Sequence, residues 1–515
     1  MCRLGFGCRY SMAPHPTARG ILRRVPTMTD RVPSPKLPAS RALPVAVWLA
    51  CVGCTPPEAE RDPRWDALVA YLSDQMVPWQ VPGAQLVIIE DGRIAHSAAL
   101  GVTQAGSSTA VTRETRFRLG SVTKQFTATA LLQLRLRGLL DLQAPIDTYV
   151  PDFALGDGLD ASELTLHRLL THSSGLSGVS EQARCETEDI GIAPYLADHR
   201  DELLLFQEPD VLYNYSNRGY GVAGLVAEAV TGKPFDQVIR DEVLRPAGLD
   251  RMAFDAREPS RGPPATGHVY SRTDGSLSRT ESIDGLCSAV WPSGGLVGSA
   301  EDLARWELIL LSEMSGRFDA ALWEELTGPQ WPRSSSHYGY GITVNSYHDL
   351  PRITHGGSVG GFRTLMAVFP EHDFGVALTL NSYAYTSPEP VPGESATGFV
   401  LERAVELFLD QDIEPDPVAT PEPDDLPDYV GEWSARYELG EVSTFLRDGA
   451  LWIRLSEPEV HETEMLPYTM STWQYLDHDG ALQSLSWTTG TDDHDYLVAR
   501  HGVARRVEEE EEPAP

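Results

Sequence analysis

The chain has 515 residues with 42% hydrophobic and 8% aromatic side chains, a composition typical of a folded globular protein of about three units. Its formal net charge of −33 argues against nucleic acid as a partner, because a field of that sign repels phosphate groups. The sequence contains no internal repeats.

The first segment of the chain, residues 1–54, has the features of an export signal. A basic, proline-rich stretch precedes an apolar run over residues 42–53, which is shorter than the about 20 residues needed to cross a bilayer. The end of this run, WLACVGC, resembles a bacterial lipoprotein cleavage site with Cys54 or Cys51 taking the lipid, although the usual leucine three positions earlier is missing. We therefore expect an exported protein, periplasmic or at the cell surface, either lipid-anchored to a membrane or free. Residues 55–64 are expected to form a tether.

Residues 65–410 are expected to form one large domain. Residues 84–100 predict a β-hairpin that turns at Asp-Gly, and a mostly helical stretch follows from Ser121. Residues 352–381 return to strands, with PEHDFG as a turn, and residues 395–410 predict a closing helix. Strands at both ends with helices between them predict an α+β fold, in which helices flank an antiparallel sheet and a helical lobe is inserted.

The C-terminal part is expected to be a separate, smaller domain. Residues 411–427 are rich in proline and acidic side chains, as in a linker. Beyond them, TFLRDGALWIRL and WQYLDHDGALQSLSW each place an Asp-Gly turn between two strand-forming runs. Residues 428–506 are therefore predicted to form a small all-β domain resembling a barrel, and residues 507–515 a solvated acidic tail.

The segment RLGSVTKQF (118–126) places one of only three lysines, Lys124, three residues after Ser121 at the predicted start of a helix. A structural interpretation makes Ser121 the N-cap of a helix that ends at Gly138. A capping box would then need Glu or Gln where Lys124 stands, and a cation there opposes the helix dipole by about 0.3–1 kcal/mol. Burial lowers the pKa of a lysine, so this position suits a neutral amine that acts as a general base.

Residues three apart share one face of a helix, so the Lys124 amine is expected to reach the Ser121 hydroxyl and take its proton. Ser121 would then be a nucleophile activated by an adjacent base. Its backbone N–H, near the helix start, is available to a developing oxyanion. A Ser-x-x-Lys spacing is weak evidence in most chains, but chance matches are fewer where lysine is scarce.

Further motifs follow in a characteristic order. They are FRLGSVTKQFTATAL (117–131), LLTHSSGL (169–176), YNYSNRGYGVAGLVAEAVTGKPF (213–235), PSGGLVGSAEDLARW (292–306) and THGGSVGGFRTLMAVFP (354–370). Together they resemble the serine β-lactamase-like and penicillin-binding-protein-like family, in its class C, D-Ala-D-Ala carboxypeptidase and esterase branch. The resemblance covers roughly residues 65–410. It implies a helical lobe on an antiparallel sheet flanked by helices, which agrees with the predicted elements.

The resemblance implies that Ser121 is acylated and that Lys124 is its base. Tyr215-Ser216-Asn217 matches the family's Tyr-x-Asn element, in which Tyr215 would share proton transfer with Ser121 and the leaving group. Asn217 would hold Lys124 or a substrate carbonyl, and it is also a candidate N-cap for the helix that follows. The alternative for Tyr215 is a surface loop tyrosine.

His355-Gly356-Gly357 occupies the place of the family's Lys-Thr-Gly, where the lysine gives a fixed positive charge for a substrate carboxylate. Histidine is charged only part of the time near pH 7, which weakens the case for a resistance β-lactamase or a transpeptidase. Esterase-like and aminopeptidase-like relatives commonly carry His-x-Gly. Gly357 would let substrate approach the backbone closely, and the Ser358 N–H would be the second oxyanion donor. The alternative for His355 is a strand histidine with a satisfied hydrogen bond.

The prediction is a serine hydrolase that forms an acyl-enzyme on Ser121 and acts on a small molecule or peptide through an ester, amide or peptide carbonyl. An esterase or D-amino-acid peptidase is favoured over a resistance enzyme. The alternatives are a β-lactamase or D-Ala-D-Ala carboxypeptidase, and a catalytically inactive cell-wall-binding module. No metal or organic cofactor is expected, since the sequence has neither zinc-ligand spacings nor a phosphate-binding glycine loop before a helix.

Two further interpretations remain to be tested by structure. Gly356-Gly357-Ser358-Val359-Gly360 also matches the Gly-x-Ser-x-Gly nucleophile elbow of α/β-hydrolases, which needs a strand before it and a helix after it. The strand-forming residues that follow predict a hairpin instead. Cys185 and Cys287 are the only cysteines after the export segment, and they are either paired in a disulfide or two unpaired thiols.

Overall fold

A computed structural model describes most of the chain from residue 62 onward. The described ranges are 62–178, 189–254, 262–270, 276–280, 287–333, 336–384, 396–411, 421–435, 440–456, 460–467, 471–476, 482–499 and 502–507. The predicted export segment with Cys51 and Cys54, Cys185 and most of the acidic tail lie outside these ranges. Within them, no helix combines the length and the apolar composition that a bilayer span requires.

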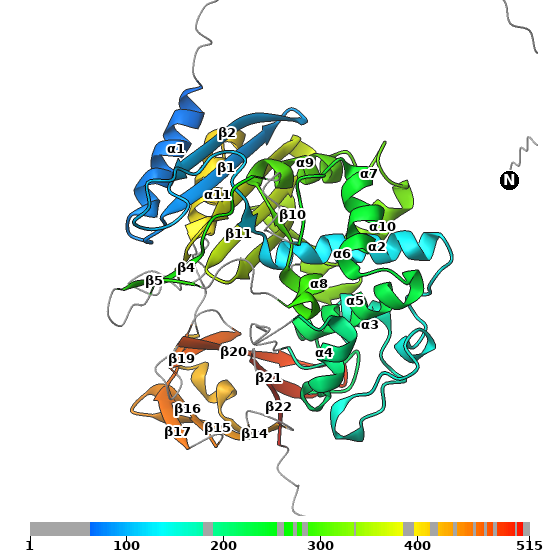
Figure 1. Ribbon diagram of the computed structural model, residues 1–515. Coiled ribbons are helices and arrows are strands. Elements are labelled where there is room, and N and C mark those ends of the chain that lie inside the picture. The colour runs from blue at the N-terminus through cyan, green and yellow to red at the C-terminus, as the bar shows by residue number, and fades with distance from the viewer. Residues whose placement is uncertain are drawn as a thin grey trace, which may run out of the picture. The chain divides into compact units, whose positions relative to one another are not determined.

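The centre of the fold is an eight-stranded sheet (Figure 1). Its strands, in spatial order, are β2 (Arg93–Gly101), β1 (Gly83–Glu90), β12 (Phe374–Leu380), β11 (Phe362–Phe369), β10 (Leu350–Val359), β9 (Thr343–Tyr347), β8 (Ser336–Tyr338) and β7 (Trp331–Arg333). Every neighbouring pair is antiparallel. The predicted hairpin turns at Asp91 and Gly92, whose φ angles of 53° and 66° are those of a tight turn between strands.

Helices cover both faces of this sheet, as predicted for the fold class. On one face, the first and last helices of the domain, α1 (Pro63–Met76) and α11 (Ala396–Leu409), bury Leu68, Leu72 and Val400 against β1, β11 and β12. On the other face, α9 (Ala300–Leu311) contacts β1, β11 and β12. The sheet strands are therefore apolar on both sides, and β12 is buried along its whole length.

The helical lobe is inserted between β2 and the remaining strands. Its helices and helical turns are η1 (Gly120–Val122), α2 (Thr123–Leu136), η2 (Ile146–Thr148), η3 (Gly156–Gly158), α3 (Leu166–Leu170), α4 (Ile192–Asp198), η4 (Arg200–Glu202), α5 (Asn217–Thr231), α6 (Phe235–Ile239), η5 (Arg240–Leu244), α7 (Arg245–Ala247), η8 (Ser288–Val290), α8 (Trp291–Gly294) and α10 (Ala320–Thr327). Helix α2 is buried on nearly every side, and α5, α8 and α10 contact it. Two small sheets accompany the lobe, β3 (Phe117–Arg118) with β6 (Val297–Gly298), and β4 (His268–Tyr270) with β5 (Leu277–Arg279) and β13 (Tyr383–Ala384).

A buried glutamate lies between α9 and the sheet. Glu307 is 0% exposed, and among the described residues neither of its carboxylate oxygens has a hydrogen-bond partner of ordinary geometry, although the backbone of Ala367 is close by. Burial raises the pKa of Glu307 well above its usual value, because the charged form cannot be solvated there. The folded protein therefore binds a proton that the unfolded chain releases above about pH 4.3.

Glu307→Gln should be at least as stable as the wild type at pH 7, with an advantage that grows as the pH rises. The folded-state pKa is raised, so the wild type loses stability above the unfolded pKa, with a slope of up to about 1.4 kcal/mol per pH unit. Denaturant unfolding at pH 5, 7 and 9 measures this, and Glu313→Gln, an exposed residue just beyond α9, is the control. A pH-independent difference between wild type and Glu307→Gln would contradict the prediction.

The C-terminal residues form a separate nine-stranded antiparallel sheet, preceded by the helical turn η10 (Leu426–Tyr429). The order is β17 (His461–Glu464), β16 (Ala450–Leu455), β15 (Glu441–Arg447), β14 (Gly431–Ala435), β22 (Gly502–Arg506), β21 (Asp495–Ala499), β20 (Leu482–Thr489), β19 (Thr472–Leu476) and β18 (Leu466–Pro467). Strands β17 and β19 contact each other, so the sheet curls as a barrel does. Trp433 and Trp473 are the largest side chains in its core. The predicted all-β, barrel-like character of the C-terminal region is thus confirmed.

Candidate active site

Ser121 lies in the 3₁₀ turn η1, directly before α2. No side chain caps the start of η1 or of α2, so the structural interpretation of Ser121 as an N-cap is wrong. Its side chain is partly buried and its hydroxyl is free of that role. The turn itself is fixed by Thr123, whose hydroxyl donates to Gly120 O at 2.6 Å and accepts from the Leu296 N–H at 3.1 Å.

Lys124 follows one turn later and is completely buried. Its Nζ lies 3.3 Å from Ser121 Oγ, 2.6 Å from Asn217 Oδ1 and 2.8 Å from the backbone oxygen of Ser293. Burial holds the pKa of Lys124 well below its usual range. The rings of Tyr215 and Tyr220 have their centroids 4.7 and 5.2 Å from Nζ. Such cation–π contacts stabilise the charged amine, but they contribute only about 1–2 kcal/mol.

The three partners of Lys124 decide where its lone pair points. Two of them, Asn217 Oδ1 and Ser293 O, are oxygens that can only accept. A neutral amine has two N–H groups, and these two acceptors use both. The lone pair is then directed at the third partner, Ser121 Oγ, which is the arrangement a general base requires.

Tyr215 and Asn217 are brought to the same place from the start of α5. Ser216, not Asn217, caps this helix, because the Ser216 hydroxyl accepts from the Gly219 N–H at 3.0 Å. The prediction of Asn217 as an N-cap is therefore wrong. Asn217 is the first residue of α5, and its side chain is used on Lys124 instead. Tyr215 is partly buried with its ring beside Lys124, which is not the environment of a surface loop tyrosine.

His355 lies on β10 beside this cluster and carries no charge near neutral pH. Burial, with a smaller effect of Lys124, lowers the pKa of His355 to about 4. Its Nδ1 lies 2.7 Å from the carbonyl of Gly356, so Nδ1 carries the proton and donates. The Tyr338 hydroxyl, 3.1 Å from Nε2, then donates to that nitrogen. Both ring nitrogens of His355 therefore have a hydrogen-bond partner, as the alternative interpretation of a strand histidine with a satisfied hydrogen bond predicts.

The two predicted oxyanion donors also lie close together. A Cβ atom added to Gly120 would lie 2.6 Å from Ser358 N, so the turn that carries Ser121 is packed directly against β10. Ser358 pairs with Arg363 in the β10–β11 hairpin, and no helix follows it. The nucleophile-elbow interpretation of Ser358 is therefore wrong, while its backbone N–H remains near Ser121.

Three contributors to this site were missed by the sequence reasoning: the Ser293 carbonyl, Tyr338 and His172. Ser293 and His172 lie in the motifs PSGGLVGSAEDLARW and LLTHSSGL quoted above. The sequence therefore pointed to these two segments, but not to the particular atoms that make the contacts. Tyr338 had no signal, because only the folded sheet places its hydroxyl beside His355. Cys287 is buried and disulfide-bonded, and its bonding partner lies outside the described residues.

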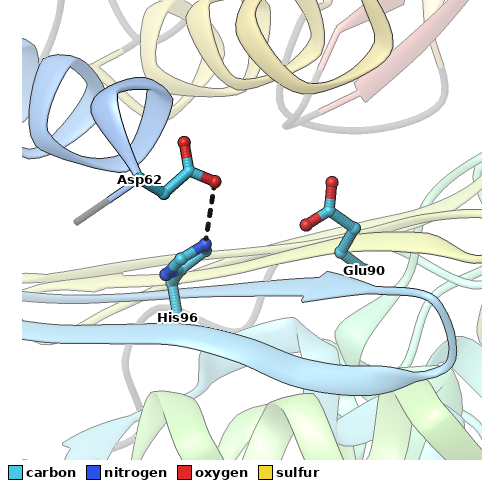
Figure 2. Close-up of side chains that lie close together, drawn as sticks. All are labelled: Asp62, Glu90 and His96. Atoms are coloured by element: carbon cyan, nitrogen blue, oxygen red, sulfur yellow. Dashed lines mark ion pairs between the residues drawn. The ribbon is translucent and has the colours of Figure 1, made fainter. Parts of the chain in front are cut away.

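A second cluster, outside this site, groups Asp62, Glu90 and His96 (Figure 2). Figure 2 shows the ion pair between Asp62 Oδ2 and His96 Nε2, which is 3.4 Å long. Arg64 already neutralises both carboxylates, at 2.7 Å from Asp62 and 2.9 Å from Glu90. The hydrogen bond from the Arg64 side chain lowers the pKa of Asp62 to about 2. The cluster therefore fastens the start of α1 to β1 and β2, and a metal ion would have to displace a guanidinium.

Residues 68–393, more than half of the chain, match the family model Beta-lactamase. The chain belongs to the beta-lactamase family. Members of this family are generally serine hydrolases. One relative, Penicillin-binding protein 4 of Amycolatopsis lactamdurans, is 28% identical over 321 residues, which are 60% of this chain and 82% of that protein.

Two solved structures share the fold across both parts of the described chain. They are the octameric penicillin-binding protein homologue from Pyrococcus abyssi (TM-score 0.61, 22% identity) and SurE with D-Leu (TM-score 0.62, 21% identity). Each covers 86% of this chain and 99% of its own. The beta-lactamase domain alone cannot supply that share, so the likeness extends into the C-terminal sheet.

Proposed function

We propose that this beta-lactamase-family chain hydrolyses an ester, amide or peptide bond through an acyl-enzyme on Ser121. The observation that carries the proposal is the environment of Lys124. Two obligate acceptors use both N–H groups of the buried amine when it is neutral, and its Nζ lies 3.3 Å from Ser121 Oγ, so the lone pair is left for that hydroxyl. An inactive binding module has no physical reason to bury a lysine in this way, at the cost of desolvating it.

The proposed reaction has an acylation step and a deacylation step. Lys124 accepts the Ser121 proton while Oγ attacks the carbonyl carbon, and the N–H groups of Ser121 and Ser358 bind the resulting oxyanion. The tetrahedral intermediate collapses, the bond to the leaving group breaks, and the proton that Lys124 accepted passes through Tyr215 to the leaving group, which restores the neutral amine. A water molecule then gives a proton to the same pair and attacks the acyl carbon. The bond from that carbon to Ser121 Oγ breaks, the pair returns the proton to Oγ, and the acid and free Ser121 are released.

His355 supports a substrate without a carboxylate at the position next to β10. With a pKa of about 4 it is neutral at pH 7, so it supplies no fixed positive charge. This favours esterase-like or D-amino-acid peptidase-like chemistry over a resistance β-lactamase. The structure of SurE with D-Leu, a protein of the same fold, is consistent with a D-amino-acyl group as one candidate.

Intact-mass spectrometry of wild type and Ser121→Ala tests the proposal. Each protein is incubated with a fluorophosphonate, a p-nitrophenyl butyrate ester and a β-lactam. We expect an adduct on the wild type and none on Ser121→Ala, with turnover of the ester but not of the β-lactam. Ser358→Ala, which keeps its backbone N–H, should still acquire the adduct. An adduct that persists in Ser121→Ala and is lost in Ser358→Ala would reverse the assignment, and no adduct on the wild type would favour a binding module.

A further inference from the structure

The backbone around Tyr215 is held by a residue in an unusual conformation. His172 follows α3 and is fully buried, and its φ angle of 62° lies in the left-handed region that non-glycine residues seldom adopt. Such a conformation typically costs about 1–3 kcal/mol and persists only where the surrounding structure demands it. The contacts of His172 show what this conformation achieves.

His172 accepts hydrogen bonds from the backbone N–H groups of the residues on both sides of Tyr215. Its carbonyl oxygen accepts from the Asn214 N–H at 2.8 Å, and its ring Nδ1 accepts from the Ser216 N–H at 3.0 Å. An amide N–H can only donate, so Nδ1 is the unprotonated nitrogen of the ring and Nε2 carries the proton. One residue thus fixes the chain immediately before and immediately after the tyrosine.

The ring of His172 also supports the ring of Tyr215. Their centroids are 4.2 Å apart with an interplanar angle of 36°, and the Lys124 amine lies 4.7 Å from the centroid of the same Tyr215 ring. Tyr338 packs against His172 as well, with centroids 5.0 Å apart. Tyr215 therefore has both its backbone and its ring orientation set by His172.

We infer that His172 is a positioning residue that aims the Tyr215 hydroxyl at the leaving group. The inference rests on the proposed function, in which Tyr215 delivers a proton to that group. It predicts a specific defect. When His172 is altered, substrates whose leaving group needs a proton should suffer far more than substrates whose leaving group departs as a stable anion.

Two butyrate esters provide the test, because they share the acyl group and differ in the leaving group. p-Nitrophenolate leaves without protonation, whereas ethoxide must be protonated as it leaves. We would measure kcat/KM for p-nitrophenyl butyrate by absorbance and for ethyl butyrate by titration of the released acid. Values are expressed per reactive Ser121, counted with a fluorophosphonate, so that misfolded protein does not contribute.

Two substitutions separate the functions of the His172 side chain. His172→Phe keeps a ring against Tyr215 and removes the acceptor. His172→Asn keeps an acceptor the same number of bonds from Cα, and asparagine tolerates the left-handed backbone. We expect His172→Phe to lower kcat/KM for ethyl butyrate by roughly 100-fold and for p-nitrophenyl butyrate by less than about 10-fold, with the ethyl ester largely recovered in His172→Asn.

Tyr215→Phe provides the reference. It should show the same selective loss, and the double variant His172→Phe/Tyr215→Phe should be no worse than Tyr215→Phe alone, because both changes remove one function. Equal losses on both esters in His172→Phe, or an additive double variant, would overturn the positioning role while leaving the proposed hydrolase intact. A wild type that cleaves neither ester would instead overturn the proposed function, and this inference with it.

Discussion

Lys124→Met should lose about 10²–10⁴-fold in kcat and react correspondingly slowly with a fluorophosphonate, while the protein remains folded. Methionine fills a similar volume with apolar atoms at a site that is 0% exposed, so the desolvation penalty of the amine disappears. The loss of the donor leaves Asn217 Oδ1 and Ser293 O without that partner, which offsets this gain by roughly 1–3 kcal/mol each. Because these two effects on stability oppose each other, the variant should stay folded while its activity falls.

The chain offers a matched control in Lys233→Met. Lys233 is exposed and pairs with Asp241 at 2.8 Å, so its replacement should change neither labelling nor turnover.

The wild-type rate should also rise with pH as Lys124 loses its proton, and level off below the ordinary lysine pKa of about 10.4, because burial lowers the pKa of Lys124. Full fluorophosphonate reactivity in Lys124→Met would exclude Lys124 as the base.

Much of the candidate site could be predicted because it depends on local spacing. The three-residue interval between Ser121 and Lys124 fixes their proximity within one helical turn, whatever the rest of the chain does. The Asp91-Gly92 turn and the β10–β11 hairpin were equally local, and both are confirmed. The order of the motifs then identified Tyr215 and Asn217 as further members of the site. Asn217 contacts Lys124 although the two residues are 93 positions apart in the chain.

The remaining contacts could not be predicted because they depend on the tertiary fold. The Ser293 carbonyl is a backbone atom 169 positions from Lys124, and no residue type marks it. Ser216 took the cap predicted for Asn217 because Lys124 competes for the asparagine oxygen, a contact that helix patterns do not contain. The left-handed conformation of His172 could not be predicted from the sequence either, because a histidine, unlike a glycine, does not indicate a positive φ angle.

Gly357→Ala should remove most of the activity and destabilise the fold. A Cβ atom at this position would lie 1.9 Å from the backbone oxygen of Leu119, and a backbone atom cannot swing away as a flexible side chain can. Leu119 immediately precedes the turn of Ser121, so β10 and that turn would be forced apart. The N–H groups of Ser121 and Ser358 would then no longer converge on one oxyanion, and losing one such donor typically lowers kcat by about 10²–10³-fold.

Gly356→Ala is the matched control, one residue earlier on the same strand. Gly356 is exposed, and the nearest atom to an added Cβ would be Thr364 O at 3.9 Å, an ordinary contact. Its unfolding midpoint and ester turnover should remain close to those of the wild type, whereas Gly357→Ala should lose about 1–3 kcal/mol of stability through overpacking. Denaturant unfolding and kcat for p-nitrophenyl butyrate measure both effects. If the two alanine variants behaved alike, the close packing of β10 against the Ser121 turn would not be what aligns the oxyanion donors.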